Sequence, residues 1–397
     1  MRLERRRIDW FSTSIIILLC VFLITKEARA FSGSDTAGGV WNIIQLLFLA
    51  IGFIKLLQNC LILPKHPVFF ALLLYCTCAF LFAVPLAESL SVSTFFSLLM
   101  ILYPSLLLVL LYCVGKRIDI TRKGPLFWTF FIISLILISA MFRYYGKGET
   151  EEGRGAISDV YYILGLLPLM LACTKGKWRF VPVLVTTFAV IFSTKRTGLL
   201  ALSVMMILYF VLAMIKERNL KKFAKILLLF ALCAALFVGF FLYMDNTFED
   251  MQLVDRLLRL SEDGGSGRDV RWKITWESFC SSDLLHMVFG HGKGSIWDAT
   301  LVGETHNDFL QVLYEHGFLA FLAYVGFYVA LLAELVHMFR AKYPHAVLFA
   351  MSVICSLFLA MFSYYVIAPT YITCGILCYG FFLADFHKFQ ADEGMSE

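Results

Sequence analysis

Continuous apolar runs of about 18 or more residues recur along this 397-residue chain. Each run is long enough to cross a hydrocarbon layer about 30 Å thick as a helix. The composition agrees, because 60% of the residues are hydrophobic and only 16% are charged, against about 25% charged in a soluble domain. The sequence therefore predicts an all-α polytopic membrane protein.

The apolar runs predict about twelve membrane-spanning helices, and the first of them has two interpretations. Arg5-Arg6-Arg7 followed by residues 10–25 is typical of a first spanning helix or of a signal peptide, and Ala28-Arg29-Ala30 offers a cleavage pattern. We favour an uncleaved helix, because another apolar run follows directly. The remaining predicted spans are residues 41–63, 68–87, 94–114, 126–142, 158–173, 180–193, 199–215, 226–244, 309–339, 347–366 and 370–385.

Basic residues fall on one side of the predicted helices. The N-terminus and the short loops 115–124, 174–179 and 216–225 are basic, whereas the intervening short loops carry few basic residues. The positive-inside rule then places these loops and both termini in the cytoplasm. The protein is expected in the inner (cytoplasmic) membrane of the cell. The predicted organisation is helices one to nine in residues 1–244, one long extracytoplasmic loop between helices nine and ten at 245–308, helices ten to twelve in 309–385, and a cytoplasmic tail at 386–397.

The 245–308 loop is the longest polar stretch of the chain and begins with two predicted helices. Residues 250–259 place apolar side chains on one face, which predicts a short amphipathic helix on the membrane surface. The run Gly264-Gly265-Ser266-Gly267 then predicts a break before a second short helix at 268–280.

The second helix carries two tryptophans one turn apart, Trp272 and Trp276, which are typical of a membrane interface. Arg268 and Arg271 would then lie near the headgroup layer. There they contact ordinary lipid headgroups, or they form a site for a phosphorylated lipid.

The last part of the loop combines a glycine-rich turn with a histidine. Residues 289–295 lack the spacing of a nucleotide-binding loop, so we interpret them as a tight turn whose N–H groups can accept an anion. Asn307 or Thr305 caps the following helix. His306 is a structural hydrogen-bonding residue or a catalytic one, and Asp308 and Glu315, seven residues apart, would share a face of the following helix.

Other polar residues within apolar runs have simpler interpretations. The spacings of Cys76 with Cys78 and of Cys374 with Cys378 lack neighbouring ligands and predict helix packing, so no metal site is expected. Lys55 and Glu334 mark a polar pathway or extend their charged ends to the interface, and we favour the second interpretation. The short turn 193–198 lies outside the membrane by helix parity.

Four motifs in this order resemble those of the bacterial O-antigen ligase and O-antigen polymerase family. The matching residues span only about 193–198 and 262–320. They are Ser-x-x-Arg-Thr (Ser193, Arg196 and Thr197), Ser-Gly-Arg-x-x-x-Trp (Ser266 to Trp272), Phe-Gly-x-Gly-x-Gly (Phe289 to Gly294) and His-Asn-x-x-Leu with a later Glu-x-Gly (His306 to Gly317). One departure is Leu319-Ala320, where the family has a second glycine.

The resemblance implies a metal-independent glycosyltransferase without cofactor that takes a glycan from undecaprenyl diphosphate outside the cytoplasmic membrane. Arg196 and Arg268 would hold the diphosphate, and His306 would act on the acceptor sugar. The further expected substrate contacts are Lys195, Arg271, Trp272, Asn307 and Glu315. Either Asp308 or Glu315 orients His306 or replaces it as the base.

The partners expected are the undecaprenyl-diphosphate-linked glycan donor, a glycan or lipid A-core acceptor, and membrane lipids, with no nucleic acid. A polymerase joins repeat units, whereas a ligase caps the lipid A-core, and the sequence leaves both open. The alternative is a flippase for lipid-linked oligosaccharides or another polysaccharide transporter, although these often show matching halves. A structural or sensory protein would explain the helices but not the clustered arginines and histidine.

Overall fold

The computed structural model describes residues 9–32, 35–59, 66–84, 86, 91–118, 124–146, 159–193, 195–217, 239, 264–297, 304–363 and 369–394. Every regular element within these ranges is a helix, which confirms the predicted all-α class. The number of membrane spans and the division of the chain into segments stay predictions. The span expected at 226–244 and the amphipathic helix expected at 250–259 lie outside the described residues.

Most of the predicted spans correspond to a single helix each, whose ends differ from the predicted ones by at most seven residues. A short 3-10 helix, η2 (Gly176–Arg179), leads into α8. The helices are α1 (Trp10–Ser32), α2 (Asp35–Gln58), α3 (Pro67–Ala83), α6 (Gly124–Gly146), α7 (Val160–Ala172), α8 (Phe180–Phe192), α9 (Arg196–Glu217), α16 (Ala346–Phe362) and α17 (Pro369–Asp392).

The predicted span 94–114 is wrong, because two helices take its place. These are α4 (Val92–Leu99) and α5 (Tyr103–Arg117). Pro104 lies in the first turn of α5, where a missing N–H breaks no helical hydrogen bond and the ring fixes a helical φ. In the middle of one long helix the same proline would remove a hydrogen bond and clash with the preceding turn.

The predicted span 309–339 is also not one straight helix. It is α15 (Asp308–Arg340), which leaves helical geometry at Gly317, where φ is 77°. The hydroxyl of Tyr324 donates to the carboxylate of Asp308 over 3.3 Å, whereas a straight helix would set these residues about 24 Å apart. The ring of Phe309 also lies 5.2 Å from that of Tyr324. The two arms of α15 therefore fold back against each other at Gly317.

The core of the bundle is formed by α5, α7 and α17, whose side chains are almost all buried. These helices approach closely because glycines lie where they cross. A methyl group added at Gly380 of α17 would come within 3.0 Å of the Leu111 backbone, and one at Gly165 of α7 would meet the Cys374 side chain at 2.7 Å. Small residues at such crossings are typical of helices that pack within a membrane.

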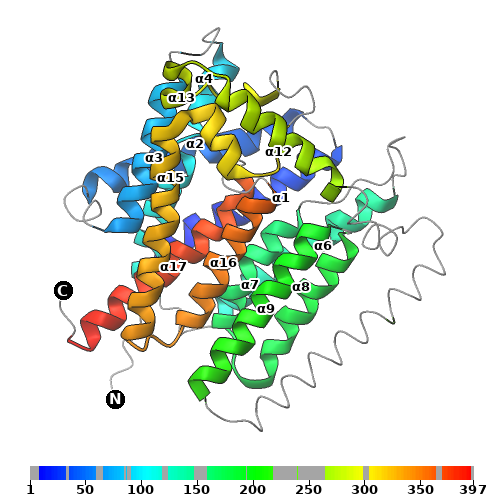
Figure 1. The fold of residues 1–397 in the computed structure, drawn as a ribbon. Helices are drawn as coiled ribbons and strands as arrows, with labels where there is room; N and C mark the ends of the chain where they lie inside the picture. Colours follow the sequence, from blue (N-terminus) through cyan, green and yellow to red (C-terminus); the bar gives the residue numbers. More distant parts are fainter. Residues whose placement is uncertain are drawn as a thin grey trace.

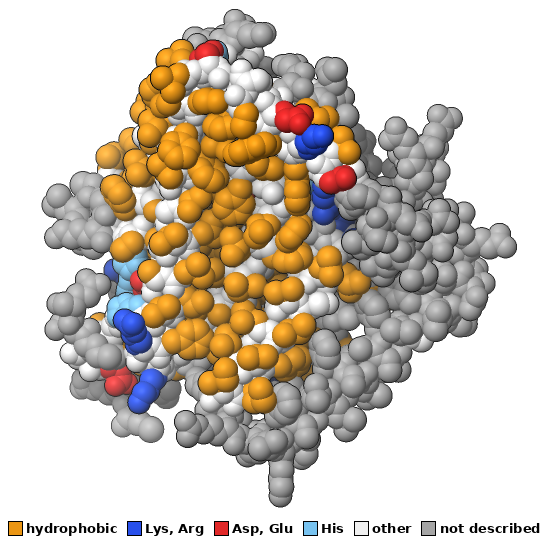
Figure 2. Space-filling view, viewed as in Figure 1, with side chains coloured by type: hydrophobic (Ala, Val, Ile, Leu, Met, Phe, Trp, Pro, Cys, Tyr) orange, Lys and Arg blue, Asp and Glu red, His pale blue; other side chains and the backbone are white. Residues whose placement is uncertain are grey.

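One face of the bundle is largely apolar (Figure 2). On α2, Ile43, Phe53 and Leu57 are each more than half exposed. Of the described helices, Gly39–Gln58 and Asp308–Arg340 are long and apolar enough to cross a membrane by length and composition, and seven shorter apolar helices accompany them. An exposed apolar surface of this extent is typical of contact with lipid or with another protein.

The end of α5 lies beside the start of the chain's first helix and the C-terminal part of its last helix, and we call this end of the molecule the terminal end. Arg117 at the end of α5 lies 3.6 Å from the carboxylate of Asp9, just before α1. The ammonium group of Lys388 in α17 donates to the carbonyls of Gly115 and Ile118 over 2.9 and 2.8 Å. The short helices α4, α12 (Gly264–Cys280) and α13 (Leu284–Phe289) lie at the opposite end, the site end (Figure 1).

Candidate functional site

Helix α12 joins two of the sequence motifs that lie far apart in the chain. The guanidinium of Arg268 donates from Nη2 to the hydroxyl oxygen of Thr197 over 3.0 Å. The glycine run 264–267 was expected to break the chain before this helix, and Gly267 has a φ of 72° although α12 is assigned from Gly264. Regular helical geometry therefore begins at Arg268, directly after this glycine.

The turn before α9 presents Lys195 and Arg196. The hydroxyl of Ser193 accepts the backbone N–H of Lys195 over 3.2 Å and donates to the carbonyl of Val190 over 2.7 Å. This double contact ties the turn to the end of α8. Arg196 is the first residue of α9 and is half-buried.

The loop that carries His306 is held by α12. Arg271 donates from Nη1 to the carbonyl of Glu304 over 3.2 Å, and the indole N–H of Trp272 donates to the carbonyl of Thr305 over 2.9 Å. Trp272 was expected at the membrane interface, and the structure places its indole against this loop and near the ring of Phe362. Its expected contact with substrate stays a prediction. Trp276 points away and is 51% exposed.

His306 lies between two residues that fix the backbone. Its φ is 52°, an uncommon conformation for a residue with a side chain. The Thr305 hydroxyl donates to the Asn307 carbonyl over 2.9 Å and accepts the Asn307 N–H over 3.1 Å. The Asn307 side chain accepts the N–H of Leu310 over 3.1 Å, which confirms the predicted helix cap. Asn307 was also expected to contact the substrate, and that second role stays a prediction.

The electrostatics of the site keep His306 neutral. Burial, followed by the charges of Arg268, Lys195 and Arg271, lowers the pKa of His306 to about 4. Burial, with the charge of Arg268, lowers the pKa of Lys195 to about 8, although Asp159 and Glu304 act in the opposite direction. A neutral imidazole next to several cationic groups can accept a proton while its neighbours bind an anion.

The glycine-rich turn packs backbone to backbone against the fold of α15. A methyl group added at Gly290 would lie 2.3 Å from the carbonyl oxygen of Glu315, and one at Gly317 would lie 2.4 Å from the nitrogen of Gly290. Both residues have positive φ, at 87° and 77°. The N–H groups of His291 and Gly292 donate to the carbonyls of Tyr314 and Glu315 over 3.1 and 2.9 Å. Only glycine fits at either position.

The turn contacts a carboxyl group of the protein itself. The carboxylate of Glu315 is 2% exposed. It accepts the Gln311 side chain over 3.0 Å and the backbone N–H of Gly294. Glu315 thus holds the turn to α15 through the N–H of Gly294, and binding of an external anion by the turn stays a prediction. The expected role of Glu315 in substrate binding also stays a prediction.

Three residues of this region were not singled out as functional from the sequence. Burial raises the pKa of Glu304, against the charges of Arg271 and Lys195. Lys293 donates to the carbonyl of Ser97 over 2.7 Å, and burial lowers its pKa to about 8. Thr197 belongs to a quoted motif but was given no role. No spacing rule indicates these contacts, because each joins segments that only the tertiary fold brings together.

The fold and the site define an all-helical protein with one largely apolar face, in which arginines, a lysine and a neutral histidine gather at one end. The motifs of this site lie within residues 181–325, which match the family model described as O-antigen ligase. The match supports the resemblance to the O-antigen ligase family over this segment of the chain. The family is membrane-associated and acts in polysaccharide assembly. No curated protein sequence matches the chain.

Proposed function

We propose that this protein is a membrane glycosyltransferase that moves a glycan from undecaprenyl diphosphate to an acceptor sugar during cell-surface polysaccharide assembly. The observation that carries the proposal is the hydrogen bond of Arg268 to Thr197. It brings the Ser-x-x-Arg-Thr turn to α12, and α12 in turn holds the loop of His306. The cationic side chains and the imidazole of His306 therefore lie close enough to interact electrostatically, although they come from three separate segments.

The diphosphate of the donor is the group that the cationic side chains bind. A guanidinium meets phosphate oxygens in a planar, bidentate manner. As the bond between the anomeric carbon and the diphosphate oxygen breaks, the negative charge grows on that oxygen, and Arg268 with Arg196 stabilises it. Lys195 adds a further positive charge below its pKa of about 8.

His306 accepts the proton of the acceptor hydroxyl. The hydroxyl oxygen forms the new bond to the anomeric carbon, its proton moves to the neutral imidazole, and the lipid diphosphate leaves with the electron pair of the broken bond. The lowered pKa of His306 keeps the imidazole unprotonated at neutral pH. The transfer needs no nucleotide sugar, because the lipid-diphosphate donor carries its own leaving group.

The decisive experiment supplies purified protein with lipid-linked repeat units, with and without a lipid A-core acceptor. Elongated lipid-linked glycan in the absence of core identifies a polymerase, and product formed only with core identifies a ligase. Absence of any new glycosidic bond in both reactions, with lipid-linked glycan moved across a vesicle membrane, would establish a transporter and overturn the proposal.

A variant at His306 tests the assignment of the base. We expect His306→Ala to insert and fold normally while undecaprenyl-linked glycan accumulates and transfer falls by roughly 100- to 10,000-fold, the usual contribution of a general base. His286→Ala is the matched control, since His286 lies on α13 and pairs with Asp283 over 2.6 Å. Normal transfer by the His306 variant would remove this residue from the mechanism.

A further inference from the structure

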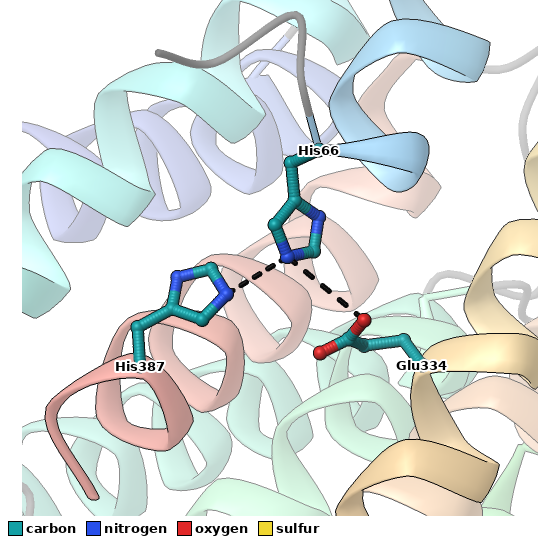
Figure 3. Close-up of side chains that lie close together, drawn as sticks. All are labelled: His66, Glu334 and His387. Atoms are coloured by element: carbon teal, nitrogen blue, oxygen red, sulfur yellow. Dashed lines mark hydrogen bonds and ion pairs between the residues drawn. The ribbon is translucent and has the colours of Figure 1, made fainter. Parts of the chain in front are cut away.

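Three side chains from distant parts of the chain converge at the terminal end (Figure 3). They are His66 just before α3, Glu334 of α15 and His387 of α17. The Nε2 atoms of the two histidines lie 2.8 Å apart, and His66 Nε2 lies 3.9 Å from a carboxylate oxygen of Glu334. One nitrogen or oxygen from each residue lies within 4.8 Å of the other two.

The position of Glu334 differs from the sequence-based expectation. A side chain extending its charge to the interface would be exposed, but Glu334 is 8% exposed. The interfacial interpretation is therefore wrong for this residue. A buried carboxylate requires a compensating positive charge or full hydrogen bonding, and ionisable residues within membrane helices usually indicate function.

The spacing of the three side chains suits a metal ion. Ligands of a tetrahedral zinc ion lie about 2.0–2.1 Å from the metal, and hence about 3.3 Å from one another. The separations of 2.8 and 3.9 Å lie on either side of that value. Small side-chain rotations would make both equal. Two imidazoles and a carboxylate leave the fourth position of the tetrahedron for water.

The surroundings orient His387 for such a role. Its Nδ1 lies 2.6 Å from the hydroxyl oxygen of Tyr112 in α5. A metal-binding histidine almost always uses its second ring nitrogen in this way, because the hydrogen bond fixes both the tautomer and the ring orientation. The neighbouring residue Lys388 anchors the same turn of α17 to the carbonyls at the end of α5.

We propose that His66, Glu334 and His387 form a binding site for a divalent first-row transition metal ion, of which Zn²⁺ is the representative. Imidazole with one carboxylate suits such ions, whereas Mg²⁺ and Ca²⁺ prefer oxygen ligands alone. The ion would join α3, α15 and α17 at the terminal end. This site lies at the opposite end from His306 and stands independently of the proposed transfer reaction.

The role of the ion is structural. It would neutralise the buried carboxylate of Glu334. It would also fix the C-terminal part of the long arm of α15, which begins after Gly317. Without a metal ion the same residues can share a proton, with one histidine donating to the other. Metal content distinguishes these two states directly.

The test uses full-length protein in detergent, stripped with EDTA and titrated with Zn²⁺, with metal content measured by mass spectrometry. We expect one bound Zn²⁺ per wild-type chain and a higher midpoint of thermal unfolding with the metal. His66→Ala, His387→Ala and Glu334→Gln should lose this binding. Tyr112→Phe should bind about 10- to 100-fold more weakly, as expected for an outer-sphere residue.

His286→Ala is the control, because it removes a histidine that lies beside Asp283 at the site end. It should retain the metal. In EDTA, each variant should unfold at the same thermal midpoint as the metal-free wild type, and this result would show that its fold is intact. Co²⁺ provides a second readout, since its absorption bands in the wild type should indicate tetrahedral nitrogen and oxygen ligands. Equal Zn²⁺ uptake by the wild type and the triad variants, or no saturable uptake by the wild type, overturns the site.

Discussion

At the scale of single residues, Arg268 connects chemistry to architecture. A guanidinium has five N–H donors in a planar fork, so the same group can orient on Thr197 and bind phosphate oxygens. Lysine has the charge but neither the fork nor the fixed geometry. The contact with Thr197 places this fork in the turn that also presents Lys195 and Arg196.

We therefore expect Arg268→Lys to lose most of the transfer activity. The loss of a charge-assisted hydrogen bond, worth about 1.5–3 kcal/mol, should lower kcat/KM by roughly 10- to 100-fold. The measurement is glycan transfer by purified protein with a lipid-linked donor. Lys273→Arg serves as the control, because Lys273 lies on the exposed side of α12 and pairs with Glu277 at 3.9 Å. Wild-type activity in the Arg268 variant would exclude the proposed diphosphate contact.

The pH dependence of transfer should report the two shifted groups of the site. His306 must be neutral to act as a base, so its pKa of about 4 predicts an acid limb near pH 4 in kcat/KM. Lys195 loses its positive charge above its pKa of about 8, which predicts a fall on the alkaline side. In Lys195→Arg the alkaline limb should move above pH ~10, since arginine stays charged, and the acid limb should not move. An acid limb near 6.5 would contradict a buried imidazole among cations.

The sequence indicated much of the site but not how its parts meet. Arg268, Arg271 and His306 were predicted because they lie in one polar loop, and proximity in sequence carries that inference. Lys293 was missed because its partner Ser97 lies in another segment, and Glu304 was missed although it lies in the same loop, because its interaction with Lys195 also crosses segments. The role of Trp272 was incomplete for a related reason: a tryptophan near an apolar run suits an interface and a buried hydrogen bond equally well.

At the scale of elements, the fold of α15 decides how the site is assembled. Gly317 lets the helix reverse, so that its short first arm lies beside its long second arm. The reversal also creates the surface that receives the glycine-rich turn at Gly290. His306 is placed directly before the short arm, and its position therefore depends on this fold.

Gly317→Ala should destabilise the protein and reduce transfer together. The conformation of Gly317, with φ 77° and ψ 175°, is essentially restricted to glycine and costs about 1–3 kcal/mol for a residue with a side chain. The added methyl would in addition clash with the Gly290 backbone. Gly326→Ala in the same helix is the matched control, because a methyl group there meets nothing within 4 Å. It should be neutral or stabilise the helix by up to about 1 kcal/mol. Thermal unfolding in detergent checks both, and equal midpoints for the two variants would argue against the close contact.

The apolar pattern predicted where helices occur better than where they bend. Hydrophobic runs locate α2, α3 and α6 to α9 because any helix in an apolar environment needs such a run. The pattern is blind to a break within a run, so α4 with α5 and the two arms of α15 were each predicted as one span. Pro104 and Gly317 were visible in the sequence, but proline and glycine also occur within continuous membrane helices.

At the scale of the whole molecule, the two ends carry different groups. The site end gathers Arg268, Lys195 and His306, whereas the terminal end gathers Asp9, Arg117, Lys388 and the His66–Glu334–His387 triad. The basic 115–124 loop begins at the terminal end, next to Asp9 before α1 and Lys388 of α17. The positive-inside rule predicts that this end is cytoplasmic and that the site faces outward, and this orientation stays a prediction.

That orientation can be tested with a native cysteine. Cys280 at the end of α12 is exposed, whereas the other described cysteines are buried or half-buried. A membrane-impermeant maleimide should label Cys280 in intact cells, because the site end is predicted to face away from the cytoplasm. Glu393→Cys in a Cys280→Ser background reports the terminal end, and Glu393 is exposed after α17. Its labelling should require permeabilised cells, because the terminal end is predicted to face the cytoplasm. The replacement should leave the orientation unchanged, since acidic residues contribute little to topology. The reverse pattern would place the site in the cytoplasm and would overturn both the predicted topology and the extracytoplasmic transfer reaction proposed from it.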